Sequence, residues 1–289
     1  MSLFSGIGKL GKTEASANDK KVASAPVPEK KPVPAPKPKP QVNEADLIFD
    51  KSYTCPVCDH KFRSKTIKTG KVHLVSQDTD LRPKHSHIDS IKYDVIVCPS
   101  CGYAALGRFF PSVMPTQAKF IQENITRNFR GIPEVESVYT YDYALKNYQL
   151  ALDNANVKKA KPSEKAYTSL KMAWLYRGKA ETLDESSPSY NETISELNKK
   201  ETELMLKAYD GFKEAFEKEA FPICGMDELT VTYLVAELAR RAGDYDESAR
   251  WISRVLTSRV ASERIKEKAR VIKELIEENR TTEETEEVK

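Results

Sequence analysis

The sequence has no apolar run long enough to cross a membrane. A spanning helix needs about 20 consecutive apolar residues, and no stretch of the 289 residues approaches that length. The first eleven residues contain Phe4, Ile7 and Leu10, but they have neither a continuous apolar run nor a small-residue cleavage site. We therefore expect no membrane span, no secretory signal and a cytoplasmic location.

The sequence also has little net charge. Its 46 Lys and Arg residues nearly balance its 43 Asp and Glu residues, which leaves a formal net charge of +3. Proteins that bind phosphate polymers over a large surface are usually strongly basic. The balance therefore gives no support for such a surface over the whole molecule, and any nucleic-acid binding has to come from a local patch.

Residues that catalysis needs are scarce. The chain has four histidines, and none of them follows residue 87. Cys224 therefore has no histidine base near it in the sequence, which argues against a Cys–His enzyme. We recognise no phosphate-binding loop, paired-carboxylate motif or nucleophile–base pair. We expect a protein that is not an enzyme, with Cys224 a buried, inert thiol.

Residues 1–45 have a composition of their own. Proline occupies every second position from Pro32 to Pro40, which removes backbone donors and favours the polyproline II conformation. Almost no apolar residue is present to offset the entropy lost on ordering, so we expect a disordered tail. Its first eleven residues are a candidate short motif for a partner's groove. A docking site for a proline-reading domain is an alternative role for the tail.

Four of the five cysteines form two CxxC pairs, Cys55 with Cys58 and Cys98 with Cys101. Two cysteines separated by two residues fit one tight turn that points both sulfurs at one ion, and Zn²⁺ takes four such ligands in a tetrahedron. Gly102 permits a left-handed backbone after the second pair. We therefore predict one Zn²⁺ per chain on these four cysteines. Iron is the alternative metal, because the pairs also resemble rubredoxin knuckles.

The residues around the pairs predict a small β module over residues 46–112. Short β-branched runs at Val72–Val75 and Tyr93–Val97 are typical of strands, and Lys61 and Phe62 start another. The whole is a zinc-ribbon arrangement. The region also carries all four histidines, which we expect at the surface because four thiolates complete the zinc shell: His60, His73, His85 and His87. A second site or a pH-sensitive contact at His85–His87 is the alternative.

From Pro115 onward, apolar residues recur at helical spacing. Proline and glycine breaks divide this region into about seven helices: Pro133, Pro162, Pro188, Pro222 and Gly243. The turn Gly243-Asp244-Tyr245, with Ala249 four residues later, resembles the turn of a tetratricopeptide repeat. We predict a tetratricopeptide-like helical domain over residues 113–280 and a frayed acidic tail over 281–289. The fold class is α+β. A generic α-bundle is the alternative for the helical part.

A family resemblance covers Tyr53 to about Glu181. It is carried by Cys55-Pro-Val-Cys58 followed by Phe62, by the segment Val72–Pro83, and by the block Tyr93-Asp-Val-Ile-Val-Cys98-Pro-Ser-Cys101-Gly-Tyr-Ala104. This stretch resembles the bacterial domain-of-unknown-function family 2225. The resemblance implies a metal-binding knuckle pair joined to helical repeats, and it implies no activity.

Two functions are compatible with this organisation. The first is a non-catalytic adaptor whose helical repeats bind a protein or peptide partner. Tyrosines are candidates to line its groove or to belong to the core: Tyr139, Tyr141, Tyr143, Tyr148, Tyr167 and Tyr176. The alternative is nucleic-acid binding through a basic stretch of the zinc ribbon. Its charges are Lys61, Arg63, Lys65, Lys68, Lys71, Arg82 and Lys84.

Overall fold

The structure is a computed structural model that describes residues 42–133 and 137–287, with side chains described up to residue 281. Almost all of the predicted disordered tail, including the candidate motif in its first eleven residues, lies outside these described residues. Strands fall between residues 48 and 106, and α-helices follow from Pro115 onward. The predicted α+β class is therefore confirmed for the described residues.

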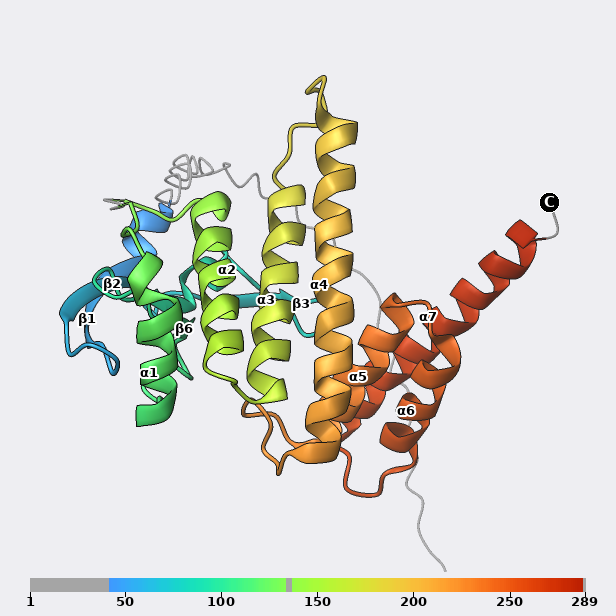
Figure 1. Ribbon diagram of the computed structural model, residues 1–289. Coiled ribbons are helices and arrows are strands. Elements are labelled where there is room, and N and C mark those ends of the chain that lie inside the picture. Colours follow the sequence, from blue (N-terminus) through green and yellow to red (C-terminus); the bar gives the residue numbers. More distant parts are fainter. Residues whose placement is uncertain (1–41, 134–136, 288–289) are drawn as a thin grey trace, which may run out of the picture. The chain divides into compact units, whose positions relative to one another are not determined.

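Three antiparallel hairpins occupy the amino-terminal part of the described chain (Figure 1). Their strands are β1 (Ile48–Thr54) with β2 (Lys61–Ile67), β3 (Leu74–Gln77) with β4 (Pro83–His85), and β5 (Val95–Val97) with β6 (Ala104–Leu106). The first CxxC pair lies in the turn between β1 and β2, and the second lies in the turn between β5 and β6. Two of the three hairpins therefore end in a cysteine knuckle.

Seven α-helices follow in the described residues. They are α1 (Pro115–Asn124), α2 (Tyr141–Val157), α3 (Pro162–Ala180), α4 (Tyr190–Lys218), α5 (Glu228–Arg241), α6 (Tyr245–Thr257) and α7 (Glu263–Glu287). Pro115 and Pro162 occupy the first helical position, where the missing amide hydrogen removes no helical bond. The side chains of Thr140, Asp227 and Asp244 cap the starts of α2, α5 and α6.

Helix boundaries agree with the predicted breaks at several places. Gly243 lies between α5 and α6 with a positive φ of 80°, as a glycine after a helix end commonly does. The tetratricopeptide likeness of this helix pair stays a prediction. Helix α7 continues to Glu287, so the expected limit of the helical region at residue 280 falls inside it. Within the described residues, none of the helices has the length and hydropathy that a membrane crossing requires.

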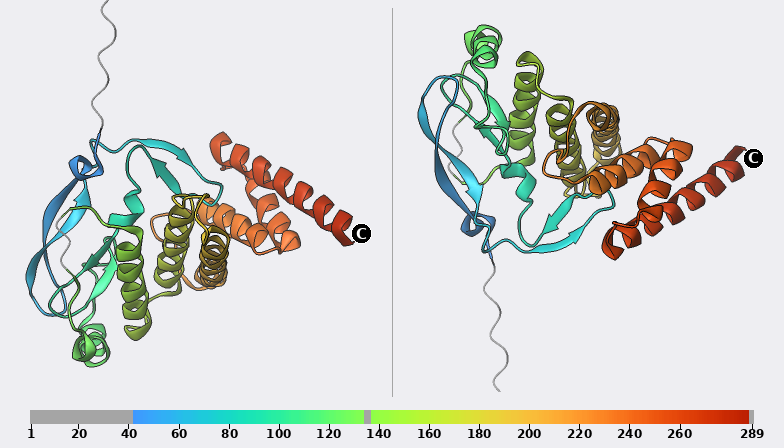
Figure 2. Two further views of the ribbon diagram at one scale, coloured as in Figure 1. Left: turned by 90° about the horizontal axis from the view of Figure 1, so that it is seen from above. Right: turned by 90° about the horizontal axis from the view of Figure 1, so that it is seen from below.

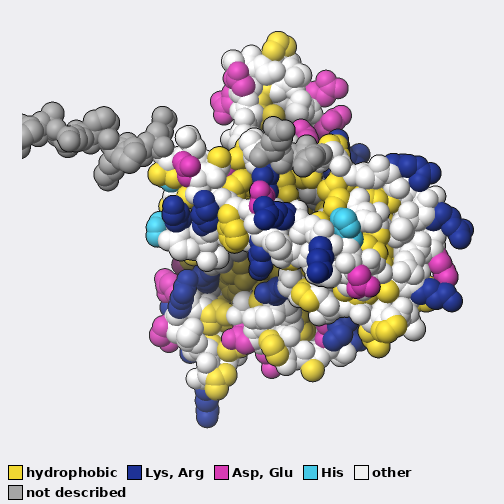
Figure 3. Space-filling view, turned by 90° about the vertical axis from the view of Figure 1, so that its left-hand side faces the viewer, with side chains coloured by type: hydrophobic (Ala, Val, Ile, Leu, Met, Phe, Trp, Pro, Cys, Tyr) yellow, Lys and Arg dark blue, Asp and Glu magenta, His cyan; other side chains and the backbone are white. Residues whose placement is uncertain are grey.

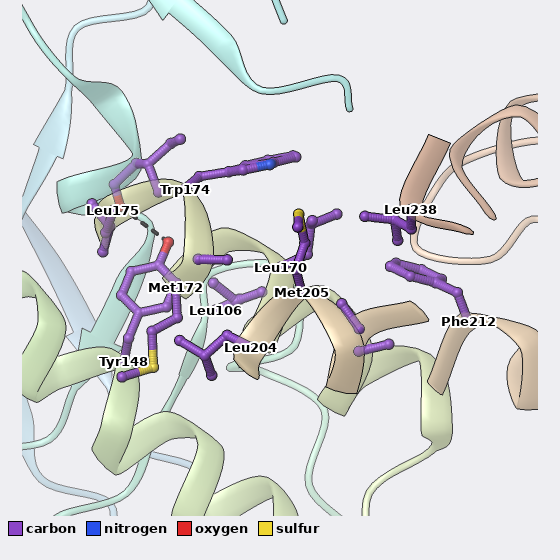
Figure 4. Close-up of a cluster of buried hydrophobic side chains, with 14 of the residues drawn as sticks. Leu106, Tyr148, Leu170, Met172, Trp174, Leu175, Leu204, Met205, Phe212 and Leu238 are labelled. Atoms are coloured by element: carbon purple, nitrogen blue, oxygen red, sulfur yellow. Dashed lines mark hydrogen bonds between the residues drawn. The ribbon is translucent and has the colours of Figure 1, made fainter. Parts of the chain in front are cut away.

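The helices from α2 onward form two groups, and α5 contributes buried residues both to the main core and to a separate cluster with α6 and α7. Helices α2, α3 and α4 lie side by side, and α5, α6 and α7 form the second group (Figure 2). Buried side chains of β6, α2, α3, α4 and α5 point toward one another, among them Leu106, Tyr148, Leu170, Phe212 and Leu238 (Figure 4). The core therefore runs from the second knuckle hairpin into the helices.

Three short 3-10 helices lie among these elements, and η2 contributes Ile91 to the main core. They are η1 (Glu44–Leu47), η2 (Ser90–Tyr93) and η3 (Thr126–Asn128). In η2, the carboxylate of Asp89 accepts a hydrogen bond from the amide of Ile91 and caps the helix. The buried hydroxyl of Tyr148 on α2 donates to the carbonyl of Ile91 at 3.0 Å (Figure 4). This bond joins η2 to the centre of the helical core.

Candidate metal centre

The four paired cysteines converge on one point. Their sulfur atoms all lie within 4.8 Å of one another. Two sulfur pairs across the hairpins are separated by 3.6 Å (Cys55–Cys101) and 3.7 Å (Cys58–Cys98). A regular tetrahedron with metal–sulfur bonds of about 2.3 Å has edges of about 3.8 Å. The separations fit that figure and exceed the roughly 2.05 Å of a disulfide bond.

The first knuckle is shaped by its backbone. The amide of Cys55 donates to the carbonyl of His60, and the amide of Asp59 donates to the carbonyl of Cys55, both at 2.9 Å. The amide of Val57 points at the Cys55 sulfur at 3.4 Å. Asp59 has a positive φ of 59°, a conformation that aspartate tolerates better than most residues. These bonds turn the chain so that both sulfurs of the pair face the same point.

The second knuckle repeats this pattern. The amide of Cys98 donates to the carbonyl of Tyr103 at 2.8 Å, and the amide of Gly102 donates to the carbonyl of Cys98 at 3.0 Å. Gly102 has the left-handed φ that the sequence predicted, at 74°. A Cβ atom on Gly102 would lie 2.6 Å from the ring of Phe129, so the position also requires glycine for space.

Ionisation of one thiol in the cluster opposes ionisation of its neighbour. Hydrogen bonds from Cys101 and Cys55 lower the pKa of the Cys98 thiol. Hydrogen bonds to Cys55 and Cys98 raise the pKa of Cys101, because its own ionisation would place a second negative charge beside the first. A divalent cation relieves this conflict, because coordination stabilises the deprotonated form of each thiol that binds it. The set therefore fits a tetrahedral metal that prefers sulfur ligands, which includes both zinc and iron.

Burial separates one cysteine from the other three. Cys55, Cys98 and Cys101 are buried, whereas Cys58 reaches the solvent. The buried sulfurs lie in a small hydrophobic cluster that includes Tyr103, Phe110 and Ile121 and is separate from the main core. The hydroxyl of Tyr103 donates to the carbonyl of Phe110 at 3.1 Å, so this buried polar group has a hydrogen-bond partner.

Three polar side chains from the helical part hold the knuckles in place. Gln122 of α1 donates to the carbonyl of Val57 at 3.0 Å. Thr126 of η3 donates to the carbonyl of Cys101 at 2.8 Å, and Asn154 of α2 donates to the carbonyl of Gly102 at 3.0 Å. Sequence reasoning missed these residues, because a polar side chain on a helix carries no local signal of what it contacts. They make the metal centre a joint product of ribbon and helices.

Residues 48–276 match the model of the domain-of-unknown-function family 2225, described as an uncharacterized protein conserved in bacteria. The chain belongs to family 2225. The matched segment contains both knuckles and extends the resemblance seen in the sequence, which ended at about Glu181, into α7.

One curated relative of this family 2225 member is an uncharacterized protein of Borreliella burgdorferi. It is 24% identical over 166 residues, which are 47% of this chain. The chain covers 54% of that relative, so the match spans about half of the relative's length. No solved structure matches the chain.

The histidines of this family 2225 member do not join the cysteines. His60 stacks on Phe62 with ring centres 6.3 Å apart. His85 bonds Ser90 through Nδ1 at 3.0 Å, and burial lowers its pKa. Among the described residues, the four cysteines are the one group of three or more metal-ligating side chains that converge. A second site at His85–His87 gains no support.

The basic stretch from Lys61 to Lys84 does not form one surface. Arg82 is buried, and its guanidinium holds both carboxylate oxygens of Glu181 at 3.0 and 2.9 Å. Lys84 pairs with the same carboxylate at 3.0 Å. Lys61 and Arg63 on β2 remain exposed. Figure 3 shows Lys and Arg side chains on this face interspersed with acidic ones.

The tyrosines proposed to line a groove lie mostly between the ribbon and the helices. Tyr148 is fully buried in the core. Tyr139 stacks on Tyr93 with ring centres 4.9 Å apart, and Tyr141 donates to Asp89 at 3.1 Å. The sequence left open whether these tyrosines line a groove or belong to the core. Tyr139, Tyr141 and Tyr148 pack inside the protein.

Cys224 lies apart from the metal centre. Its thiol donates to the carbonyl of Ser163 at 3.3 Å, and burial raises its pKa to about 11. A thiol with that pKa is almost entirely protonated at neutral pH, which makes it a poor nucleophile. This environment agrees with the expectation of an inert thiol, although Cys224 is only partly buried.

Proposed function

We propose that this member of family 2225 is a cytoplasmic, non-catalytic adaptor that binds one Zn²⁺ and uses its helical half to bind a protein or peptide partner. The observation that carries the proposal is the convergence of four sulfurs within 4.8 Å. Structural zinc sites take four protein ligands, whereas catalytic sites keep a position for water or substrate. Four cysteines leave no such position, so a metal held here acts on the fold.

Hydrogen bonds connect the cysteine knuckles to the first helices. Gln122 and Asn154 join the two knuckles to α1 and α2. Metal-binding free energy at a structural site contributes directly to folding. Zinc would therefore fix the position of the two knuckle hairpins against the first helices and present the helical part as a stable scaffold.

The helical half supplies surface for a partner. Val260 and Val271 of the α6–α7 region and Leu206 of α4 are exposed large apolar side chains. Contiguous exposed apolar patches mark protein interaction sites, whereas single exposed apolar side chains occur on most protein surfaces. The proposed adaptor function depends on partner binding by the helical half. The metal would contribute by stabilising the scaffold to which these helices belong.

A partner-capture experiment distinguishes the proposed adaptor function from nucleic-acid binding. Full-length tagged protein with its metal is incubated with lysate of its native cells, with and without nuclease. We expect the same protein partner in both samples, and a complex that can be rebuilt from the two purified proteins. Recovery that depends on intact nucleic acid would instead favour the alternative role of the stretch from Lys61 to Lys84.

A further inference from the structure

A groove of about 350 Å³ lies where β3, α5 and α7 meet. Its lining includes Leu81, Tyr233 and Ile265, together with Arg264 and Lys268 of α7. Figure 2 shows the β3–β4 hairpin running along one side of the helices toward α5. The four cysteines of the candidate metal centre are not among these residues.

The loop that forms one wall of the groove is held in an unusual conformation. Leu81 has a positive φ of 71°, which a bulky residue rarely adopts. Its neighbour Asp80 is fully buried and accepts hydrogen bonds from Trp174 at 3.0 Å and Arg177 at 2.6 Å. Such backbone persists where the surrounding contacts determine it, and it occurs often at binding sites. These contacts fix the Leu81 side chain in the groove.

Strand β3 leads into the groove with one edge available. Among the described residues, β3 pairs with β4 alone. Leu74 and Val75 of this strand are 54% and 70% exposed, and Gln77 at its end lines the groove. Across the groove, Val260 is 86% exposed. A strand edge beside apolar side chains is the arrangement that binds extended peptides by strand addition.

The two α7 cations that line the groove form no ion pair among the described residues, and the carboxylate of Asp227, which also lines it, accepts from the amide of Thr230 instead. No carboxylate among the described residues pairs with Arg264, and the amine of Lys268 contacts the amide oxygen of Gln77. Burial and the charge of Arg264 lower the pKa of Lys268. Elsewhere on α7 the cations are compensated, since Arg270 pairs with Glu263 and Glu267. The uncompensated positive charge of α7 therefore lies at the groove, where an anionic partner would relieve it.

We infer that this groove binds an extended segment of a partner protein that carries acidic side chains next to apolar ones. The inference rests on the proposed adaptor function and names the surface and the chemistry of the partner. Acidic side chains meet Arg264 and Lys268, and apolar ones cover Leu81 and Val260. A phosphate polymer would leave that apolar surface in water, so a peptide fits better.

Selection from a displayed library of random dodecapeptides tests the inference on the full-length, metal-loaded protein. We expect selected peptides enriched in Asp and Glu next to Val, Leu or Ile. Synthetic copies, measured by fluorescence anisotropy, should bind the Arg264→Glu/Lys268→Glu variant about tenfold more weakly or worse. The matched control, Arg270→Glu/Lys273→Glu, makes the same charge change on α7 away from the groove and should bind within about twofold of the wild type.

Val260→Glu is a second variant, and its exposed side chain makes it safe for folding. It should weaken peptide binding as well. Selected peptides without acidic enrichment, no enrichment at all, or equal binding to the groove and control variants would overturn the inference. A captured natural partner that binds the groove variant at full strength would also overturn it while leaving the adaptor function intact.

Discussion

Asp80 anchors the loop between β3 and β4 to the helical core. Its carboxylate is fully buried between α3 and α5, where Trp174 and Arg177 donate to it and Arg241 lies 3.9 Å away. Burial alone would raise the pKa of Asp80, but the hydrogen bond and charge of Arg177 lower it, so the group stays ionised. At the residue scale, the loop between β3 and β4 is held by a buried ion pair.

Replacement of Asp80 by alanine should destabilise the fold strongly. Removing one partner of a buried ion pair leaves the other charge uncompensated and costs about 3 kcal/mol or more. We expect Asp80→Ala to lower the free energy of unfolding by about 3 kcal/mol in urea titration.

The control for this change is Asp142→Ala. Asp142 pairs with Lys179 at the surface, and its side chain is 69% exposed. Exposed pairs contribute little, so the loss there should stay below about 1 kcal/mol. A loss for Asp80→Ala as small as that of the control would contradict the role given to the buried pair.

At the scale of elements, the two knuckle hairpins matter most. Each uses the same pair of backbone bonds to aim two sulfurs, and neither hairpin alone supplies four ligands. A short hairpin has little stability of its own in water. A metal bound by all four cysteines would therefore join two elements separated by about 40 residues of chain.

Loss of one knuckle should release the metal. The double variant Cys98→Ser/Cys101→Ser keeps two thiols, too few for a structural zinc shell. We expect elemental analysis to find about one Zn per wild-type chain and close to none in the variant, together with a lower melting temperature. Cys224→Ser is the matched control, since Cys224 lies outside the cluster. Iron in the wild-type protein would show that the bound metal is iron and not zinc. Full zinc retention in the double variant would refute the assignment of the site to these cysteines.

At the scale of the whole molecule, charge is distributed without a dominant sign. The formal net charge is +3. The positive charges of Arg82 and Lys84 are both paired with the carboxylate of Glu181. Lys61 and Arg63 stay exposed on β2. A modest patch of this kind attracts phosphate weakly and loses its attraction as salt rises.

Nucleic-acid binding should therefore be weak and non-specific. We expect dissociation constants of about 100 µM near physiological salt, with steep weakening as salt increases. Electrophoretic mobility shift across a salt series measures this. Lys199→Glu/Lys200→Glu on α4 is the control for Lys61→Glu/Arg63→Glu. Micromolar binding at 150 mM salt that only the β2 variant loses would overturn the adaptor proposal.

Local sequence determined the parts of this protein whose geometry arises within a few residues. The CxxC spacing, Gly102 and the prolines at helix starts specify turns and boundaries, because each acts on the backbone beside it. The knuckles, strands near the predicted runs and seven helices therefore follow from the sequence.

Tertiary structure alone decided which distant groups meet. Arg82 is neutralised by Glu181, 99 residues away, and Asp80 is buried against Trp174, 94 residues away. Asn154 reaches the second knuckle from α2. The groove likewise arises where Leu81 meets α7. Such contacts depend on how helices and hairpins pack, and packing is set by the fit of whole surfaces, which no short pattern encodes.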